Sequence, residues 1–164
     1  MSTATAQQHT IVVLVQNETG TINRLVSMFR RRGFSLACFS AGDCEIPGFS
    51  RLTLVVNGDD EALRQCLRQL DKLIDVVEVQ DLKPDQSVAR ELALIRVEPK
   101  DAERDAVCAL VSEFMAHMPK STKSAMLLEI AAEVEMIERF ITALRPYNIT
   151  EIVRTGTIAM KVGD

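Results

Sequence analysis

The segment Asn17–Thr21 (Asn-Glu-Thr-Gly-Thr) contains residue types that could hold a small anion. It follows the strand-forming run Ile11–Val15 and precedes apolar residues at helical spacing, Ile22, Leu25 and Phe29. The first amides of a helix lack partners within the helix, and the helix dipole is positive at that end. A carboxylate or a phosphate could therefore bind where this helix begins.

The same residues also suit a tight turn that leads into a helix cap. Asn17 and Gly20 tolerate unusual backbone angles, and Thr19 or Thr21 could accept a hydrogen bond from the first free amides. Short motifs of this kind occur often without a ligand. By itself, the segment leaves both interpretations open.

Cysteine and histidine form no recognisable site. No C-x-x-C pair occurs, and His9 and His117 lie far apart in the sequence. No nucleophile motif frames His117, so we expect it to contact solvent or a helix end. The thiols are expected to be reduced and mostly buried, with Cys66 in a helix as a small core residue and Cys108 in the same role. The four cysteines are Cys38, Cys44, Cys66 and Cys108.

Composition argues against nucleic-acid and membrane partners. The chain has 164 residues, a formal net charge of -4, one Tyr and no Trp, so base-stacking platforms are scarce. Its basic cluster, Arg30–Arg32, falls at the end of a predicted helix, where it suits the dipole. No apolar run of about 18 residues and no secretion signal is visible. We expect a cytoplasmic globular protein.

The elements around the segment predict a ferredoxin-like unit. Strand and helix periodicities alternate in the order βαββαβ. Such a unit covers one face of its sheet with helices and leaves the other bare, so we expect dimerisation through that face or an edge strand. The predicted elements are strand 9–16, helix 21–32, strand 34–41, strand 51–57, helix 60–72 and strand 74–80.

The pattern then begins again, which predicts a duplicated α+β fold of two ferredoxin-like βαββαβ domains. A strand is expected at 92–97 and a helix at 101–115. The predicted organisation is a first domain at 9–82, a linker at 83–90 and a second domain at 91–164. The second halves of the copies match at Leu52 with Met126, Leu54 with Leu128, Leu63 with Ile137, Leu67 with Ile141 and Leu70 with Leu144.

The copies differ at the segment where the first helix begins. In the second copy, the turn has become Glu-Pro-Lys-Asp at 98–101, which lacks the glycine and places negative charge near the helix start. An anion site is not expected there. Pro119 also interrupts the second strand of that copy, which is predicted to be weak.

Five stretches together resemble the small regulatory subunits of acetohydroxyacid synthase, also called acetolactate synthase. The likeness runs from about residue 10 to the C-terminus. The stretches are QNETGTINRL (16–25), RRRGF (30–34), SRLTLVV (50–56), QLDKLIDV (69–76) and RELALIRV (90–97).

This resemblance implies a non-catalytic partner of a larger enzyme. In this family the N-terminal domain is an ACT domain that pairs with a second copy into an eight-stranded sheet, and the feedback inhibitor valine sits between the two copies. The subunit also raises the activity of a large catalytic subunit that carries thiamine diphosphate, magnesium and FAD. No cofactor and no metal are expected in this chain.

The resemblance also assigns an effector site. It falls on Asn17, Gly20 and Thr21, with Ser35 and Leu36 facing the partner's loop. Amides near Gly20 and Thr21 would hold the carboxylate, Asn17 a polar end, and Leu36 would line the apolar side. Ser35 departs from the family, which usually has Asn there, so valine affinity is expected to be lower or the preference altered.

Two alternatives remain from the sequence. An ACT module that binds an amino acid could regulate a different enzyme or a transcription factor, although we expect neither a catalytic nor a DNA-binding domain in 164 residues. An enzyme such as an acylphosphatase would need Asn17, Gly20 and Arg24 around an anion. Arg24 is expected on the exposed helix face, and no nucleophile with a base is visible.

Overall fold

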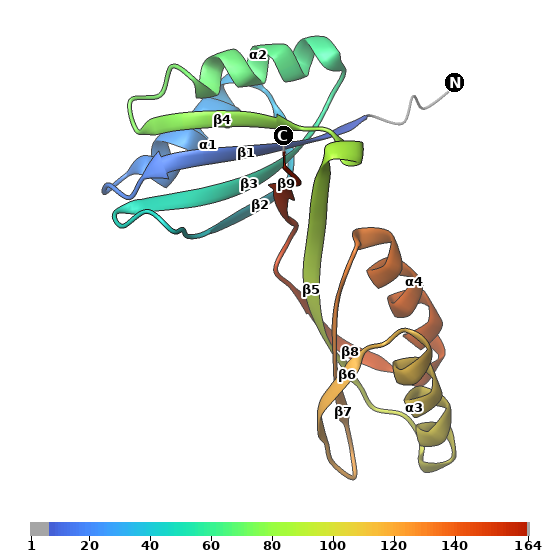
Figure 1. Ribbon diagram of the computed structural model, residues 1–164. Helices are drawn as coiled ribbons and strands as arrows, with labels where there is room; N and C mark the ends of the chain where they lie inside the picture. The colour runs from blue at the N-terminus through green and yellow to red at the C-terminus, as the bar shows by residue number, and fades with distance from the viewer. Residues whose placement is uncertain (1–6, 164) are drawn as a thin grey trace. The chain divides into compact units, whose positions relative to one another are not determined.

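The computed structural model describes residues 7–163, in which the chain forms two compact units (Figure 1). One unit contains the chain up to Ala89 and continues from Thr157 onward, and the other is Arg90–Gly156. The second domain was predicted at 91–164, but the second unit ends at Gly156. The described residues after Gly156 pack with the first unit instead. The predicted linker differs as well, since its last residues already belong to a strand that begins at Ser87.

The first unit has the predicted ferredoxin-like fold. Its sheet is antiparallel in the order β2-β3-β1-β4, so β2 and β4 are the edge strands. The elements of this repeat are β1 Gln8–Gln16, α1 Thr21–Arg32, β2 Ser35–Asp43, β3 Phe49–Asn57, α2 Asp60–Leu70 and β4 Val76–Leu82.

The core of this unit lies between the sheet and its two helices, which cover the same face (Figure 1). Alternate residues of the central strands point toward the helices, as the two-residue period of a strand requires. Ile22 is 40% exposed and lies outside the buried stripe of α1. The core side chains are Ile11, Val13, Val15, Leu52, Leu54 and Val56 from the sheet, and Leu25, Met28, Phe29, Leu63, Cys66 and Leu70 from the helices.

The opposite face of the sheet was expected to be bare, but the end of the chain returns to it. Strand β9, Ile158–Lys161, contacts β1, β3 and β4 and also pairs with β5. The Thr157 amide donates to the Cys38 sulfur at 3.1 Å, and the Ala159 amide donates to the Thr53 hydroxyl at 3.3 Å. The sequence did not indicate this strand.

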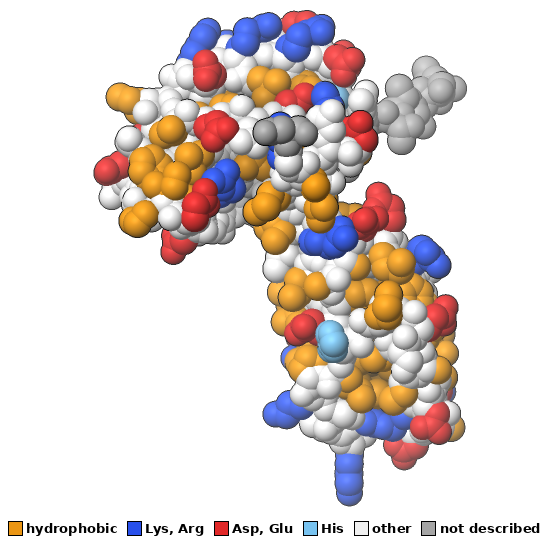
Figure 2. All heavy atoms as spheres, viewed as in Figure 1, with side chains coloured by type: hydrophobic (Ala, Val, Ile, Leu, Met, Phe, Trp, Pro, Cys, Tyr) orange, Lys and Arg blue, Asp and Glu red, His pale blue; other side chains and the backbone are white. Residues whose placement is uncertain are grey.

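Strand β9 presents a second apolar row to the outside. Ile158, Met160 and Val162 alternate along the chain and are 59%, 70% and 62% exposed. Figure 2 shows hydrophobic side chains at the surface where β9 and the start of β5 lie in Figure 1. The strand therefore covers apolar surface on one side and exposes it on the other.

The second unit repeats the fold with shorter edges. Its strands follow the order β6-β7-β5-β8, and α3 and α4 pack on a core of residues from β5 and β7. The elements are β5 Ser87–Val97, α3 Arg104–Glu113, β6 His117–Ser121, β7 Met126–Ala132, α4 Val134–Leu144 and β8 Ile149–Arg154, with short 3-10 turns at Pro84–Gln86, Asp101–Glu103 and Arg145–Tyr147.

The predicted duplication is confirmed by topology and by burial. Both copies have the βαββαβ order, and the matched apolar residues occupy equivalent positions in β3 and β7 and in α2 and α4. All of them lie in or against the two cores, Leu67 being half-buried and the others buried. The α+β fold class predicted from the sequence is therefore correct.

Candidate functional site

The segment Asn17–Gly20 connects β1 to α1, and backbone hydrogen bonds to two distant parts of the same chain hold its start. At its start, the Gln16 amide donates to the Asp75 carbonyl at 2.8 Å, and the Asn17 amide donates to the Gly48 carbonyl at 2.9 Å. The side chains of Asn17, Glu18 and Thr19 are exposed. The backbone is thus anchored while the side chains of the turn face outward.

Helix α1 begins with Gly20 in the left-handed region, at a φ of 91°. A residue with a Cβ is strained in this conformation, which explains why glycine is present. The predicted side-chain cap is absent in the described chain, because neither threonine bonds the first amides. The buried Thr21 hydroxyl donates instead to the Gln16 carbonyl at 3.1 Å.

The start of α1 retains free donors. The Thr21 amide donates to the Glu18 carbonyl at 3.1 Å, but among the described residues no acceptor is found for the amides of Ile22 and Asn23. The first turn also contains no acidic residue. Amide donors, a helix dipole and the absence of acidic residues from the first turn make this end suitable for an anion.

An ion pair that the sequence did not indicate closes the base of the segment. The Arg24 Nε lies 2.5 Å from the Asp75 Oδ2, and their side chains are 44% and 9% exposed. This hydrogen bond is the main cause that raises the pKa of Arg24 above its ordinary value. Arg24 is exposed, as expected, although its guanidinium binds an almost buried carboxylate. The signal for this partner was a lone carboxylate between Ile74 and Val76 in an apolar run.

Ser35 and Leu36 lie at the other end of the sheet in the same chain. Ser35 pairs with Asn57 across the sheet, and Asn57 pairs with Gln8, the first residue of β1. The segment follows the last residue of β1, so strand geometry separates the two groups by about 27 Å. One copy brings Asn17, Gly20 and Thr21 together but does not bring them to Ser35 and Leu36.

The side chains at that far end are partly exposed. The Ser35 hydroxyl accepts a hydrogen bond from the Asn57 amide group at 3.2 Å. Leu36 is half-buried and packs against the first core. Both residues begin β2, which is an edge strand with no neighbour on its outer side within the described chain.

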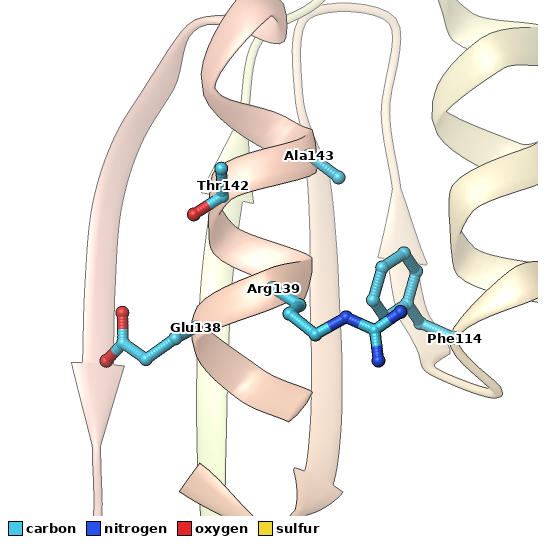
Figure 3. A pocket seen from close by; sticks show the side chains of 5 residues that line it. All are labelled: Phe114, Glu138, Arg139, Thr142 and Ala143. Atoms are coloured by element: carbon cyan, nitrogen blue, oxygen red, sulfur yellow. The ribbon is translucent and has the colours of Figure 1, made fainter. Parts of the chain in front are cut away.

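A shallow hollow occurs elsewhere, on the second unit. It has a volume of about 390 Å³ and is lined by Phe114, Glu138, Arg139, Thr142 and Ala143. Figure 3 shows Arg139 extending toward the Phe114 ring, with 5.9 Å between the guanidinium carbon and the ring centroid. None of the predicted site residues lines this hollow.

The described residues contain no cluster of His, Cys, Asp and Glu that could hold a metal ion. Burial raises the pKa of the Cys66 thiol to about 12, which fits its predicted place in the core. The same prediction for Cys108 is wrong, because Cys108 lies on the exposed side of α3. The described helices include none that is long and apolar enough to span a membrane.

Two family models match adjoining parts of the chain. A model described as "AHAS small subunit-like ACT domain" matches residues 11–78. A model described as "Small subunit of acetolactate synthase" matches residues 90–163. The two matches fall on the two copies of the repeat.

Relatives resemble the chain over nearly its whole length. The acetolactate synthase small subunit of Mycolicibacterium smegmatis is 35% identical over 94% of this chain and 92% of its own length. A protein of Archaeoglobus fulgidus named "Probable acetolactate synthase small subunit" is 37% identical over 96% of this chain and 98% of its own. The crystal structure of the acetolactate synthase small subunit from Thermotoga maritima superposes with a TM-score of 0.91, at 33% identity over 96% of this chain and 99% of that one.

Proposed function

Because the chain belongs to the family of acetolactate synthase small subunits, we propose that it activates the catalytic subunit of this enzyme and makes it sensitive to valine. The chain itself is the non-catalytic, regulatory partner in branched-chain amino-acid biosynthesis, and it acts in the cytoplasm. The observation that carries the effector part of this proposal is the start of α1, with free amides and no acidic side chain in its first turn.

The carboxylate of the amino acid is proposed to bind at this start of α1. Gly20 exposes the backbone, and the amides of Ile22 and Asn23 add to the positive end of the helix dipole. The exposed Asn17 side chain can hydrogen-bond the polar end of the ligand. The buried Thr21 contributes indirectly, because its hydroxyl is committed to the Gln16 carbonyl.

The large distance from the segment Asn17–Gly20 to Ser35 and Leu36 of the same chain supports a site shared by two copies. The last residue of β2, Asp43, pairs with Ser50, which also pairs with Val15 near the segment. If two β2 strands pair antiparallel about a twofold axis, Ser35 of the second copy lies beside Asp43 of the first. Ser35 and Leu36 of the second copy then lie beside the segment Asn17–Gly20 of the first copy.

Two features of the first unit support this dimer. Strand β2 is nine residues long and has a free edge, which is a ready template for pairing. Ile22 and Val26, one turn apart on α1, are 40% and 45% exposed. They lie on the flank opposite Arg24, whose partner Asp75 precedes the other edge strand, so they face toward β2.

The second partner is the large catalytic subunit. We propose that this subunit, and not the present chain, carries thiamine diphosphate, magnesium and FAD. Serine at position 35, in place of the usual asparagine, is proposed to weaken valine binding without abolishing it.

Regulation is proposed to work by a population shift. Valine bound across two ACT domains favours one dimer arrangement, and it inhibits only as far as its affinity differs between activating and non-activating arrangements. The test is acetolactate formation by the large subunit from the same organism, with and without this chain, during a titration with L-valine. The chain is expected to stimulate acetolactate formation, and valine is expected to reverse this stimulation.

Each other result points to a different conclusion. Stimulation that valine leaves unchanged would keep the subunit assignment and contradict the proposed effector. The complete absence of stimulation would contradict the proposal and favour an ACT module that serves another enzyme.

A further inference from the structure

Asp75 bonds the chain on both sides of the segment Asn17–Gly20. Its carbonyl accepts from the Gln16 amide at 2.8 Å, just before the segment. Its carboxylate accepts from the Arg24 Nε at 2.5 Å, in the first turn of the helix that follows. One residue, far away in the sequence, therefore joins the entrance and the exit of the segment.

The ion pair of Asp75 and Arg24 is expected to stay formed, because its carboxylate is almost buried. The Asp75 side chain is 9% exposed, whereas the Arg24 side chain is 44% exposed. A carboxylate that is almost buried loses much more when its partner leaves than a carboxylate in water does. The pair of Arg64 and Glu61 on α2 is different, because its side chains are 60% and 52% exposed and both remain hydrated when apart.

Arg24 also touches the segment directly. Its amide donates to the Gly20 carbonyl at 2.9 Å. Its Nη1 lies 3.1 Å from the position that a Cβ of Gly20 would occupy, so the guanidinium packs over the glycine. The ion pair thus holds a side chain against the most conformationally free residue of the segment.

A segment held in this way has its amides oriented before a ligand arrives. A loop that must be ordered on binding lowers affinity, because the entropy cost of ordering offsets part of the favourable binding free energy. Gly20, Ile22 and Asn23 depend most on such ordering, since no side chain caps them.

We propose that Asp75 and Arg24 are positioning residues of the effector site: their ion pair holds Asn17–Gly20 in the shape that binds the amino acid. This inference rests on the proposed function, because it concerns the same site. Neither side chain needs to contact the ligand.

The test compares the chain with its variants Asp75→Asn and Arg24→Lys, and with Arg64→Gln as a matched control on α2. Hydrogen exchange of the amides of residues 17–23 is measured by NMR without ligand, and the Kd for L-valine by calorimetry. Asp75→Asn is expected to speed exchange in the segment and to weaken valine binding about tenfold, by loss of preorganisation. Arg24→Lys keeps the charge, so a smaller loss of valine affinity is expected. Arg64→Gln is expected to change neither the exchange rates nor the Kd.

Melting temperature and dimer mass separate this effect from misfolding. If Asp75→Asn unfolds, Arg24→Lys still tests the inference, because its amine spares the buried carboxylate from being unpaired but cannot pack a guanidinium over Gly20, so a smaller loss of valine affinity is expected. Equal valine affinity in the unaltered chain and both variants would overturn the inference and leave the proposed function intact. An unaltered chain that binds no valine would overturn the proposed function, and this inference with it.

Discussion

The two copies of the repeat begin their first helices in opposite ways. In the first copy, α1 starts at a left-handed glycine with no acidic residue in its first turn. In the second, a 3-10 turn starts at Asp101, and the Glu103 carboxylate accepts from the Lys100 amide at 2.9 Å. The second copy therefore uses its own carboxylates where the first leaves room for an external one.

The edge strands also favour binding at the first copy. Strand β2 has nine residues, while its counterpart β6 has five and contains Pro119, which cannot donate to a neighbouring strand. One fold thus appears twice, but only the first copy combines free helix amides with a long free edge. The comparison teaches that the loop and the edge, rather than the fold, determine where an effector and a second copy can bind.

The largest expected effect comes from Gly20→Asp, which gives the first copy the residue type that the second has at Asp101. A φ of 91° strains any side chain, and the added carboxylate would occupy the helix amides. Valine affinity, measured by calorimetry, is expected to fall about 100-fold, the sum of strain and charge repulsion. Asp101→Gly is the matched control and should leave binding unchanged. Retained binding in Gly20→Asp would show that this segment is not the site.

Next in size is Val26→Asp, which places a charge on the flank of α1 that faces β2. If this flank is buried in the dimer, the dissociation constant of the dimer is expected to rise about 30-fold, the cost of an unpaired charge in an interface. Sedimentation equilibrium measures it. Val153→Asp on β8, where Val153 is 54% exposed, is the control and should not alter dimerisation. The reverse result would move the dimer interface to the second copy.

Ser35→Asn tests the departure from the family at the far end of the sheet. The longer amide side chain could bond the effector from the second copy, so valine affinity is expected to rise about tenfold. Thr150→Asn, at an exposed position of β8 in the second unit, serves as the control. Unchanged or weaker binding would exclude Ser35 from the effector site.

The smallest effect is expected from Thr53→Val, which removes the acceptor of the Ala159 amide from the face covered by β9. The free energy of unfolding should fall by about 1 kcal/mol, the usual cost of one lost hydrogen bond. Urea denaturation measures it. Thr150→Val removes an exposed hydroxyl that donates to the Arg96 carbonyl at the longer distance of 3.5 Å, and it should lose less stability. An equal loss in both variants would mean that β9 adds no stability through this bond.

Periodic patterns predicted most of the fold correctly. Strand alternation and helical stripes follow local rules, so both βαββαβ copies and their matched core residues could be recognised without coordinates. Strand β9 could not, because four residues carry too little pattern and their partner sheet lies more than a hundred positions earlier in the chain. Ile22 fits the helical spacing of Leu25 and Phe29 but is 40% exposed, since helical spacing alone does not determine which flank of a stripe the core covers.

The candidate site divides in the same way. By itself, the sequence determined the family, the duplication, and the glycine at which the first helix begins, because each depends on residue type and near neighbours. Only the tertiary structure decided that Asp75 pairs with Arg24, that β9 covers the open face, and that Ser35 lies at the other end of the sheet from Gly20. These are contacts and separations between distant residues, and they exist only once strand pairing has set the register of the sheet.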